Sequence, residues 1–330
     1  MSILIIGLGS IGRRHLRNLL SLEYADISVV SRLGILPDEF SALPVYLSIA
    51  DAFSSHSFDT AFICTPTSWH ICNLEELLTN KVTNIYLEKP VSDTYDKIDH
   101  ILQLASSYKN KIVVGYDLHF DLGLQKVCEL IQDNVIGAIV SVDAIAGQHL
   151  SQWRPYEDHR KGISAKKETG GGVMLDLIHE FDYLSWLLGD VYSVACLSAN
   201  SGELEIETEE VAEVLLKFSG GTIGTVHLDY FQQSLIRNCL FTGTKGSIFL
   251  DLANKKVTWV NENGDQADFN YTGFERNDRF KAIVKTFLEN DNDDRRLTSL
   301  QDGLKSLQIV LAAKKSASQN CFIKLSEFTA

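Results

Sequence analysis

The sequence has few cysteines, no excess of positive charge and no long apolar run. Its six cysteines show neither C-x-x-C spacing nor neighbouring histidine pairs, which argues against a disulfide framework or a zinc site. The net charge of −13 disfavours nucleic acid and anionic membranes as partners. No segment approaches the roughly 18 apolar residues of a membrane span. The scattered cysteines indicate reduced thiols, so we expect a cytoplasmic protein, and the apolar start lacks the basic region of a signal peptide.

A glycine-rich turn stands at the beginning of the chain. The apolar run 3–6 leads directly into the pattern G-x-G-x-x-G, and a helix-like stretch follows over 13–22. The first glycine permits a tight turn, the second lets the backbone approach a pyrophosphate, and the third lets the helix pack on the strand. The helix N-terminus also favours the negative phosphates. We therefore predict a dinucleotide site whose candidate contacts in this turn are Gly7, Gly9, Ser10, Ile11 and Gly12.

The residues after the second apolar run, 27–30, indicate which dinucleotide fits. An NAD site carries an acidic residue here for the ribose 2′-hydroxyl, whereas this chain has Ser31-Arg32. A hydroxyl and a guanidinium suit a 2′-phosphate, which a carboxylate would repel. The sequence thus favours NADP over NAD as the cofactor, and a solvated surface loop is the alternative interpretation of these two residues.

Strand and helix patterns alternate through the first third of the chain, which predicts a parallel, doubly wound sheet with ligands at the carboxyl ends of its strands. The further expected strands are 45–47, 60–64, 84–87 and 111–115, with helices over 69–78 and 94–107. After about residue 120, extended runs separated by glycine turns predict a large, mainly antiparallel sheet. Its expected strands are 138–146, 191–199, 211–218, 222–231, 235–242 and 247–252, with helices over 122–132, 173–188, 276–288 and 299–316. The fold class is therefore an α/β Rossmann domain over 1–120 and an α+β substrate-binding and oligomerisation domain over 121–330.

An acidic run over 203–207 alternates with apolar residues. This alternation is typical of the solvated face of a strand, so we expect a strand there and not an interaction tail.

Two groups of residues follow strands of the first domain. Thr65-Pro66, with His70 nearby, begins a helix whose free N–H groups would face the cofactor, although a plain helix cap explains the same residues. Glu88-Lys89-Pro90 places a lysine on the ligand-binding edge, where its charge would stabilise a developing alkoxide. An ordinary surface lysine is the alternative for Lys89.

A third group follows the triple glycine 170–172. Asp176 and His179 are three residues apart, which would place them on one face of the expected helix 173–188. A carboxylate beside an imidazole orients the ring for proton transfer. Taken alone, a helical histidine is more often a packed residue than a catalyst.

Together these elements resemble the glucose–fructose oxidoreductase / inositol dehydrogenase / rhizopine-catabolism (Gfo/Idh/MocA) family over nearly the whole chain. The family joins a Rossmann domain to an α/β domain with a large open sheet, and its members oxidise or reduce a sugar, cyclitol or nucleotide-sugar carbon with NAD(P). The resemblance implies that Lys89 is catalytic, with Asp176 and His179 as its partners. It also implies a cofactor site that adds Thr65, Pro66, His70, Glu88 and Lys89 to the glycine turn and to Ser31 and Arg32.

Two departures from the family pattern concern the substrate side. The aspartate and histidine are four apart in many members and three apart here, which displaces the histidine. The element Gly-Tyr-x-x-Arg-Phe reads Gly-Tyr-Asp-Leu-His-Phe over 115–120, so His119 replaces a substrate-contacting arginine. The cation-rich segment 153–167 resembles the corresponding part of family members that act on amino or nucleotide-linked sugars of surface glycans. It adds Trp153, Arg154 and Tyr156 to the expected substrate contacts.

The sequence therefore predicts an NAD(P)-dependent oxidoreductase that transfers a hydride to or from a sugar, cyclitol or nucleotide-sugar carbon. A dinucleotide-bound regulator without catalysis is one alternative, and an enzyme that uses bound NAD for elimination or glycoside cleavage is another. Because one face of the second sheet needs a cover, we expect a homodimer or homotetramer formed through that sheet.

Overall fold

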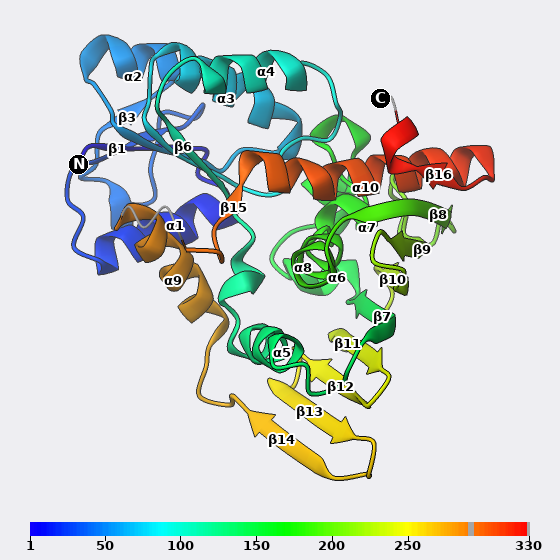
Figure 1. The fold of residues 1–330 in the computed structure, drawn as a ribbon. Coiled ribbons are helices and arrows are strands. Elements are labelled where there is room, and N and C mark those ends of the chain that lie inside the picture. The colour runs from blue at the N-terminus through cyan, green and yellow to red at the C-terminus, as the bar shows by residue number, and fades with distance from the viewer. Residues whose placement is uncertain (290–293, 329–330) are drawn as a thin grey trace. The chain divides into compact units, whose positions relative to one another are not determined.

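The computed structural model describes residues 1–289 and 294–328, which form two compact units (Figure 1). The first unit consists of Met1–Asp117 and Arg279–Gly303, and the second of Leu118–Asp278 and Leu304–Ala330. The sequence assigned all residues after 120 to one domain, whereas the chain returns to the first unit at Arg279. The physical reason is aromatic packing, because the α9 residues Phe280 and Phe287 lie against rings of the first unit.

A seven-stranded sheet forms the first unit, in the order β15-β6-β5-β4-β1-β2-β3. Its strands are β1 Ile3–Ile6, β2 Ile27–Val30, β3 Val45–Tyr46, β4 Thr60–Ile63, β5 Asn84–Leu87, β6 Lys111–Val114 and β15 Thr298–Ser299. The first six run parallel, and β15 pairs antiparallel with β6. The order 3-2-1-4-5-6 is that of dinucleotide-binding folds, in which the crevice for the ligand lies at the carboxyl ends beside β1.

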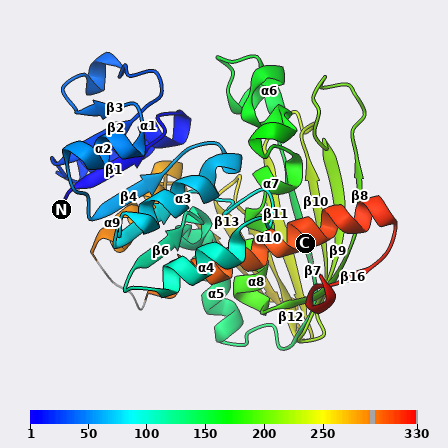
Figure 2. The same ribbon diagram turned by 90° about the horizontal axis from the view of Figure 1, so that it is seen from above.

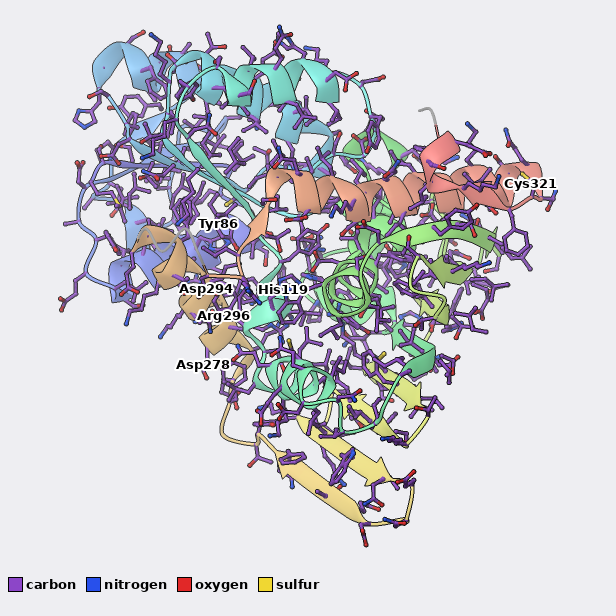
Figure 3. The ribbon with its side chains drawn as sticks, in the orientation of Figure 1. Tyr86, His119, Asp278, Asp294, Arg296 and Cys321 are labelled. Atoms are coloured by element: carbon purple, nitrogen blue, oxygen red, sulfur yellow. The ribbon has the colours of Figure 1, made fainter. Side chains whose placement is uncertain are left out.

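The helices of the first unit are α1 Ser10–Ser21, α2 Ile49–Ser55, α3 His70–Thr79, α4 Ile98–Ser106 and α9 Arg276–Leu288. Leu16 and Leu19 of α1 are fully buried, and each of the four side chains of β1 is at most 3% exposed. This continuous apolar burial is typical of a parallel sheet covered on both faces. Just before β15, Arg296 Nη2 lies 2.6 Å from Asp294 Oδ2 (Figure 3).

A nine-stranded sheet dominates the second unit, in the order β14-β13-β12-β11-β7-β10-β9-β8-β16. Its strands are β7 Ile139–Gly147, β8 Val191–Ala199, β9 Val211–Phe218, β10 Ile223–Asp229, β11 Ile236–Gly243, β12 Gly246–Asp251, β13 Lys256–Asn261, β14 Gln266–Asn270 and β16 Ile323–Lys324. Neighbours are antiparallel except β7 and β10. The large, mainly antiparallel sheet expected from the sequence is therefore confirmed, and β13 and β14 extend it beyond the expected strands.

The two faces of this sheet differ. The helices of the unit are α5 Leu122–Gln132, α6 Leu150–Trp153, α7 Val173–Asp176, α8 His179–Leu188 and α10 Leu300–Gln319. Figure 2 shows α5, α7 and α8 on one side of the strands. Residues that face the helices, such as Val214 and Val226, are buried to within 1%, whereas Leu215 and Ile223 are 50% and 59% exposed. The second face therefore carries apolar side chains that nothing in the described chain covers.

Two local expectations were wrong. The single helix expected over 173–188 is two helices, because α7 ends at Asp176 and α8 begins at His179. The backbone switches there to short-range bonds, from Glu180 N to Leu177 O and from Phe181 N to Ile178 O. The acidic run 203–207 forms turns and no strand, since Glu205 adopts a φ of 53°.

No helix among the described residues is both long enough and apolar enough to cross a membrane.

Candidate cofactor and substrate sites

The glycine turn after β1 has the geometry that a pyrophosphate requires. Gly7 adopts a φ of +91°, and a Cβ atom there would lie 2.8 Å from the Cys64 carbonyl oxygen. A Cβ atom on Gly12 would collide with the Gly7 carbonyl, whereas one on Gly9 would meet nothing within 4 Å. Gly9 is the N-cap of α1 and provides no side-chain cap. The first N–H groups of α1, at Ser10 and Ile11, thus begin beside an open space, so the turn fits a dinucleotide phosphate.

The loop after β2 carries the residues expected to recognise the cofactor ribose. The Ser31 amide donates to the Tyr46 carbonyl oxygen over 2.9 Å, and the Ser31 carbonyl accepts from the Gly34 amide over 2.9 Å. The Arg32 guanidinium lies over the ring of Trp69, 3.3 Å from its centroid. Trp69 was not among the expected site residues. Its signal in the sequence was its place four residues after Thr65, at the end of a strand next to β1.

The loop after β4 is held by a buried histidine. His70 is 1% exposed, and its Nδ1 and Nε2 lie 2.7 Å from the Pro90 carbonyl oxygen and 3.0 Å from the Thr65 carbonyl oxygen. Burial lowers the pKa of His70, although both carbonyls oppose this shift. The neutral ring donates to one carbonyl at a time. Thus His70 joins the loop of Thr65-Pro66 to that of Lys89-Pro90 from within the protein.

Glu88 is held by a partner that the sequence analysis missed. His15 Nε2 of α1 lies 2.6 Å from Glu88 Oε1, with side-chain exposures of 0% and 8%. The His15 ring packs against Phe62, Tyr86 and Phe280, at centroid distances of 5.6, 5.0 and 6.1 Å. Its sequence signal was weak, because a histidine on the inner face of a helix is usually a core residue. This contact joins α1, the helix after the glycine turn, to the residue before Lys89.

Lys89 follows β5 at the carboxyl edge of the sheet and is partly exposed, and its peptide bond with Pro90 is cis. The neighbouring Glu88 also acts on the buried Cys64, whose thiol pKa is raised by burial first and by the Glu88 charge second. Cys64 is thus a neutral thiol at ordinary pH. The lysine therefore stands at the edge of a buried layer that contains a carboxylate and an imidazole.

In the second unit, Asp176 receives a hydrogen bond from a tyrosine that the sequence analysis also missed. The Tyr230 hydroxyl donates to Asp176 Oδ2 over 2.6 Å, and Tyr230 is fully buried. Burial, followed by the Asp176 charge, raises the pKa of Tyr230 well above its usual range, so its proton stays in place. The Trp153 ring meets Tyr230 edge-on, with centroids 5.4 Å apart. The structure thus brings together Asp176 with the expected substrate contact Trp153.

His179 lies in the first turn of α8, which two ion pairs hold in place. Arg237 of β11 binds Glu180 through two contacts of 2.7 and 2.9 Å. His119 Nε2 lies 2.8 Å from Asp182 Oδ2, and its ring stacks on Trp186 with centroids 4.3 Å apart. His119 is only 2% exposed, so it offers no open surface for the substrate contact that the sequence predicted, and its contacts are with α8. Asp176 and His179 are not on one helix, contrary to the sequence expectation.

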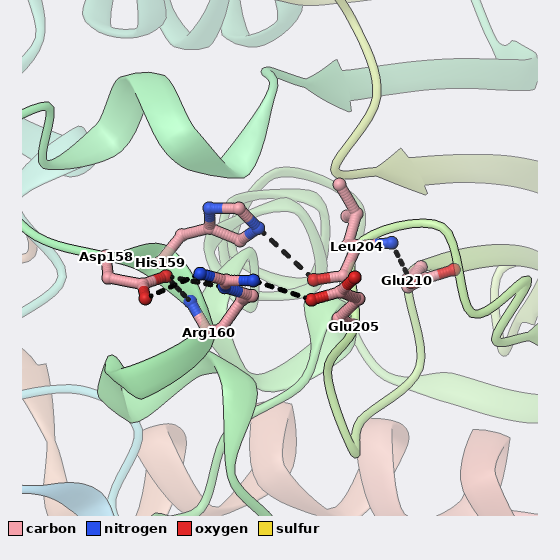
Figure 4. Close-up of polar contacts among 6 residues, drawn as sticks. All are labelled: Asp158, His159, Arg160, Leu204, Glu205 and Glu210. Atoms are coloured by element: carbon pink, nitrogen blue, oxygen red, sulfur yellow. Dashed lines mark hydrogen bonds and ion pairs between the residues drawn. The ribbon is translucent and has the colours of Figure 1, made fainter.

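Several charged side chains of the expected substrate loop are already engaged in ion pairs within the protein. Arg160 Nε binds Asp158 over 2.9 Å, and Arg160 Nη1 binds Glu205 over 2.7 Å (Figure 4). The Arg160 hydrogen bond lowers the pKa of Asp158 to about 2. His159 Nε2 lies 3.2 Å from the Leu204 carbonyl oxygen. These contacts join the loop to the turns at 203–207.

The remaining expected substrate contacts differ in exposure. Arg154 is half-buried and Tyr156 is 71% exposed. Tyr156 thus lies on the surface of the loop, while the Arg154 carbonyl oxygen accepts from the Glu157 amide over 3.0 Å.

Comparison with known proteins identifies the family of both units. Residues 1–116 match the family described as "Oxidoreductase family, NAD-binding Rossmann fold", and residues 124–249 match the "GFO/IDH/MocA C-terminal domain". The chain is 24% identical to a myo-inositol 2-dehydrogenase of Thermotoga maritima, with 99% of each chain covered. It is 26% identical to a 2,7-anhydro-N-acetylneuraminate hydratase of Escherichia coli, over 63% of this chain and 56% of that protein.

Among solved structures, the fold is similar to that of an oxidoreductase from Agrobacterium radiobacter in complex with NAD+, L-tartaric acid and magnesium. The TM-score is 0.84 at 19% identity, with 99% of this chain and 98% of that chain covered. The two family matches cover most of the chain and agree with the Rossmann strand order, the glycine turn and the large sheet of the second unit. The chain belongs to the Gfo/Idh/MocA family of oxidoreductases, with an NAD-binding Rossmann-fold domain.

Proposed function

We propose that this protein transfers a hydride to or from a hydroxyl-bearing carbon of a cyclitol, sugar or nucleotide sugar, and that it prefers NADP(H) to NAD(H). The observation that carries the proposal is Lys89 at the carboxyl end of β5, on the same edge of the sheet as the glycine turn after β1, which fits a pyrophosphate. The preference for NADP is supported by Arg32, since no Asp or Glu occurs over 31–37 to repel a 2′-phosphate.

The bound nicotinamide supplies the acceptor or donor of the hydride. In reduction, the Lys89 ammonium stabilises the developing alkoxide and donates a proton to it. In oxidation, the neutral amine accepts that proton from the hydroxyl group. Glu88 is held by His15 at the start of this loop, which limits where Lys89 can go.

Asp176 and His179 act as the partners of Lys89 in this proposal. The Tyr230 hydroxyl fixes the orientation of the Asp176 carboxylate, and the pairs of Glu180 and Asp182 fix the first turn of α8. The carboxylate orients the substrate hydroxyl, and His179 carries a proton or a substrate hydrogen bond.

The substrate class follows from the polar and aromatic groups of the second unit. Trp153 offers a ring edge beside Tyr230, and aromatic surfaces suit the apolar face of a sugar or cyclitol ring. Arg154 and Tyr156 would bind hydroxyl groups or an acidic group, and His119 would act through α8. The inositol dehydrogenase relative supports a polyol substrate. If these residues bind an acidic group, the substrate could be an acidic sugar used in the synthesis of surface glycans.

A second candidate is an elimination or hydration reaction without net redox change. It is favoured by the relative whose name is 2,7-anhydro-N-acetylneuraminate hydratase. A dinucleotide-bound regulator is less well supported, because a sensor has no use for Lys89, Asp176 and His179 together.

A thermal-shift panel tests the proposal. Cyclitols, sugars and nucleotide sugars are added to the protein with cofactor present, since a ligand at 100 times its Kd adds about 2.7 kcal/mol of stability. Each ligand that binds is then tested for conversion. We expect stoichiometric formation or loss of free reduced nicotinamide during turnover. Conversion of substrate without any change in free NADPH or NADH would instead establish the elimination reaction.

A further inference from the structure

The contact between Arg32 and Trp69 is unusually close for two side chains on the protein surface. The guanidinium carbon lies 3.3 Å from the centroid of the Trp69 ring, well inside the roughly 6 Å limit of a cation–π interaction. Trp69 is 42% exposed and Arg32 is exposed. The guanidinium is thus held by its contact with the indole and not by burial.

The positions of the two residues in the sheet place this contact in the cofactor region. Arg32 follows β2 and Trp69 follows β4, and these strands pair with β1 on its opposite sides. A contact between them therefore spans the carboxyl end of β1, where the glycine turn begins. This is the edge of the sheet at which a dinucleotide lies in the fold.

The two sides of the contact differ in how firmly they are held. The Trp69 amide donates to the Pro66 carbonyl over 3.0 Å, and the next residue, His70, is anchored to Thr65 and Pro90. The Arg32 loop is open by comparison, with Leu33 and Ile35 83% and 75% exposed. Trp69 is thus the fixed element, and it orders the arginine.

We propose that Trp69 is a specificity-determining residue for the cofactor, because it holds Arg32 ready for the 2′-phosphate of an NADP-type adenosine. With one guanidinium face on the indole, the N–H edge remains available for two hydrogen bonds to phosphate oxygens, and the second face remains available to the adenine ring. This inference rests on the NADP preference in the proposed function, and it adds the residue that makes the preference effective.

The Trp69 ring thus serves as a platform for the Arg32 guanidinium, and its physical advantage is that a long side chain is ordered before the ligand binds. An arginine loses about 2 kcal/mol of rotamer freedom when it is fixed. A guanidinium that is already stacked has lost part of this freedom before the ligand arrives, so the phosphate binds more tightly. The protein carries a net charge of −13, so a phosphate dianion needs such a local, well-placed cation.

Calorimetry with two adenosine fragments tests the inference without any turnover. Adenosine 2′,5′-bisphosphate carries the 2′-phosphate and adenosine 5′-monophosphate lacks it, so the ratio of their Kd values isolates that group. In the Trp69→Leu protein we expect 2′,5′-bisphosphate to bind roughly three- to thirtyfold more weakly, the range of a cation–π contact, and the ratio to fall toward one. Trp69→Phe keeps an aromatic face and should retain most of the ratio. Arg32→Lys keeps the charge, but its ratio of Kd values should also fall toward one, since an ammonium neither stacks flat on the indole nor forms two parallel hydrogen bonds to a phosphate.

Arg17→Ala is the matched control, because it removes an exposed arginine of α1 that pairs with Glu39, and its ratio should equal that of the unmodified protein. A preserved ratio in folded Trp69→Leu protein would overturn the role of Trp69 and leave the NADP preference intact. A ratio near one in the unmodified protein would refute both the preference and the platform. Neither result bears on hydride transfer by Lys89, which is measured separately.

Discussion

Lys89 is placed by its neighbours on both sides. Glu88 before it forms a 2.6 Å pair with His15, and the carbonyl of Pro90 after it lies 2.7 Å from His70. Both histidines are buried to within 1%. The backbone at Lys89 is therefore fixed by interactions that lie inside the protein, and its partly exposed side chain lies at the carboxyl edge of the sheet. A side chain that transfers protons needs this combination of a fixed backbone and an accessible amine.

Replacement of Lys89 tests its proposed role. Lys89→Ala should lower the rate of hydride transfer by at least about a hundredfold, because proton transfer and alkoxide stabilisation are each worth that much or more. Lys89→Arg should not restore the rate, since a guanidinium does not readily give up its proton. Single-turnover kinetics with saturating cofactor measures the step directly. Near-normal rates in the alanine variant would remove Lys89 from the mechanism.

Tyr230 offers a separate test on the second unit. Tyr230→Phe keeps the ring against Trp153 but removes the donor to Asp176, so stability should fall by ~1–3 kcal/mol and turnover should fall with it. Tyr183→Phe is the matched control, because this buried tyrosine interacts with Cys239 and not with Asp176. Urea unfolding and kcat are measured for both. If the two variants lose turnover equally, the hydrogen bond to Asp176 has no special role.

The elements show where the sequence was informative. The strands of the first unit match continuous apolar runs, and their alternation with helices predicted the parallel sheet, whereas the order of the strands came from the structure. The break between α7 and α8 was not visible, because Leu175, Leu177 and Ile178 continue the apolar pattern through it. Polar strands such as β14 were missed, since their residues alternate without strong apolar content.

The acidic run 203–207 shows how one pattern can serve two structures. Leu204 and Ile206 are buried and the three glutamates that alternate with them are exposed, as in a strand. The backbone instead turns, since the buried Glu210 carboxylate accepts from the amides of Ser201 and Leu204 over 2.6 and 3.1 Å. Burial was thus predictable from the alternation, while the backbone path depended on a carboxylate several residues away. Among the site residues, His15, Trp69 and Tyr230 were missed for a similar reason, because their partners are distant in sequence.

The contact between His15 of α1 and Glu88, which follows β5, makes a prediction about stability. His15→Leu fills a similar space but leaves the Glu88 charge buried without its imidazole, so unfolding in urea should require ~3–5 kcal/mol less free energy. Glu88→Gln should cost less, because a neutral amide still bonds to the imidazole and buries no charge. An unchanged urea midpoint for His15→Leu would show that the pair contributes nothing net.

At the scale of the whole molecule, the second sheet has an uncovered face. Leu197, Leu215 and Ile223 are 69%, 50% and 59% exposed on β8, β9 and β10. An apolar sheet face of this kind is usually covered by a partner. We expect a homodimer or homotetramer through this face, and light scattering at micromolar concentration measures it.

Leu215→Lys with Ile223→Lys should shift the assembly to a monomer without loss of the folded state. An unmodified protein that scatters as a particle of 36.8 kDa would contradict this assembly.

The return of the chain at Arg279 also sets an order of events during protein synthesis. The rings of Phe62 and Tyr86 pack against Phe287, so the first unit has no complete core until that residue has been made. Between its two segments, the ribosome must add roughly 160 residues at about 5–20 residues per second. The nascent Rossmann half therefore waits on the order of ten seconds with part of its apolar surface uncovered.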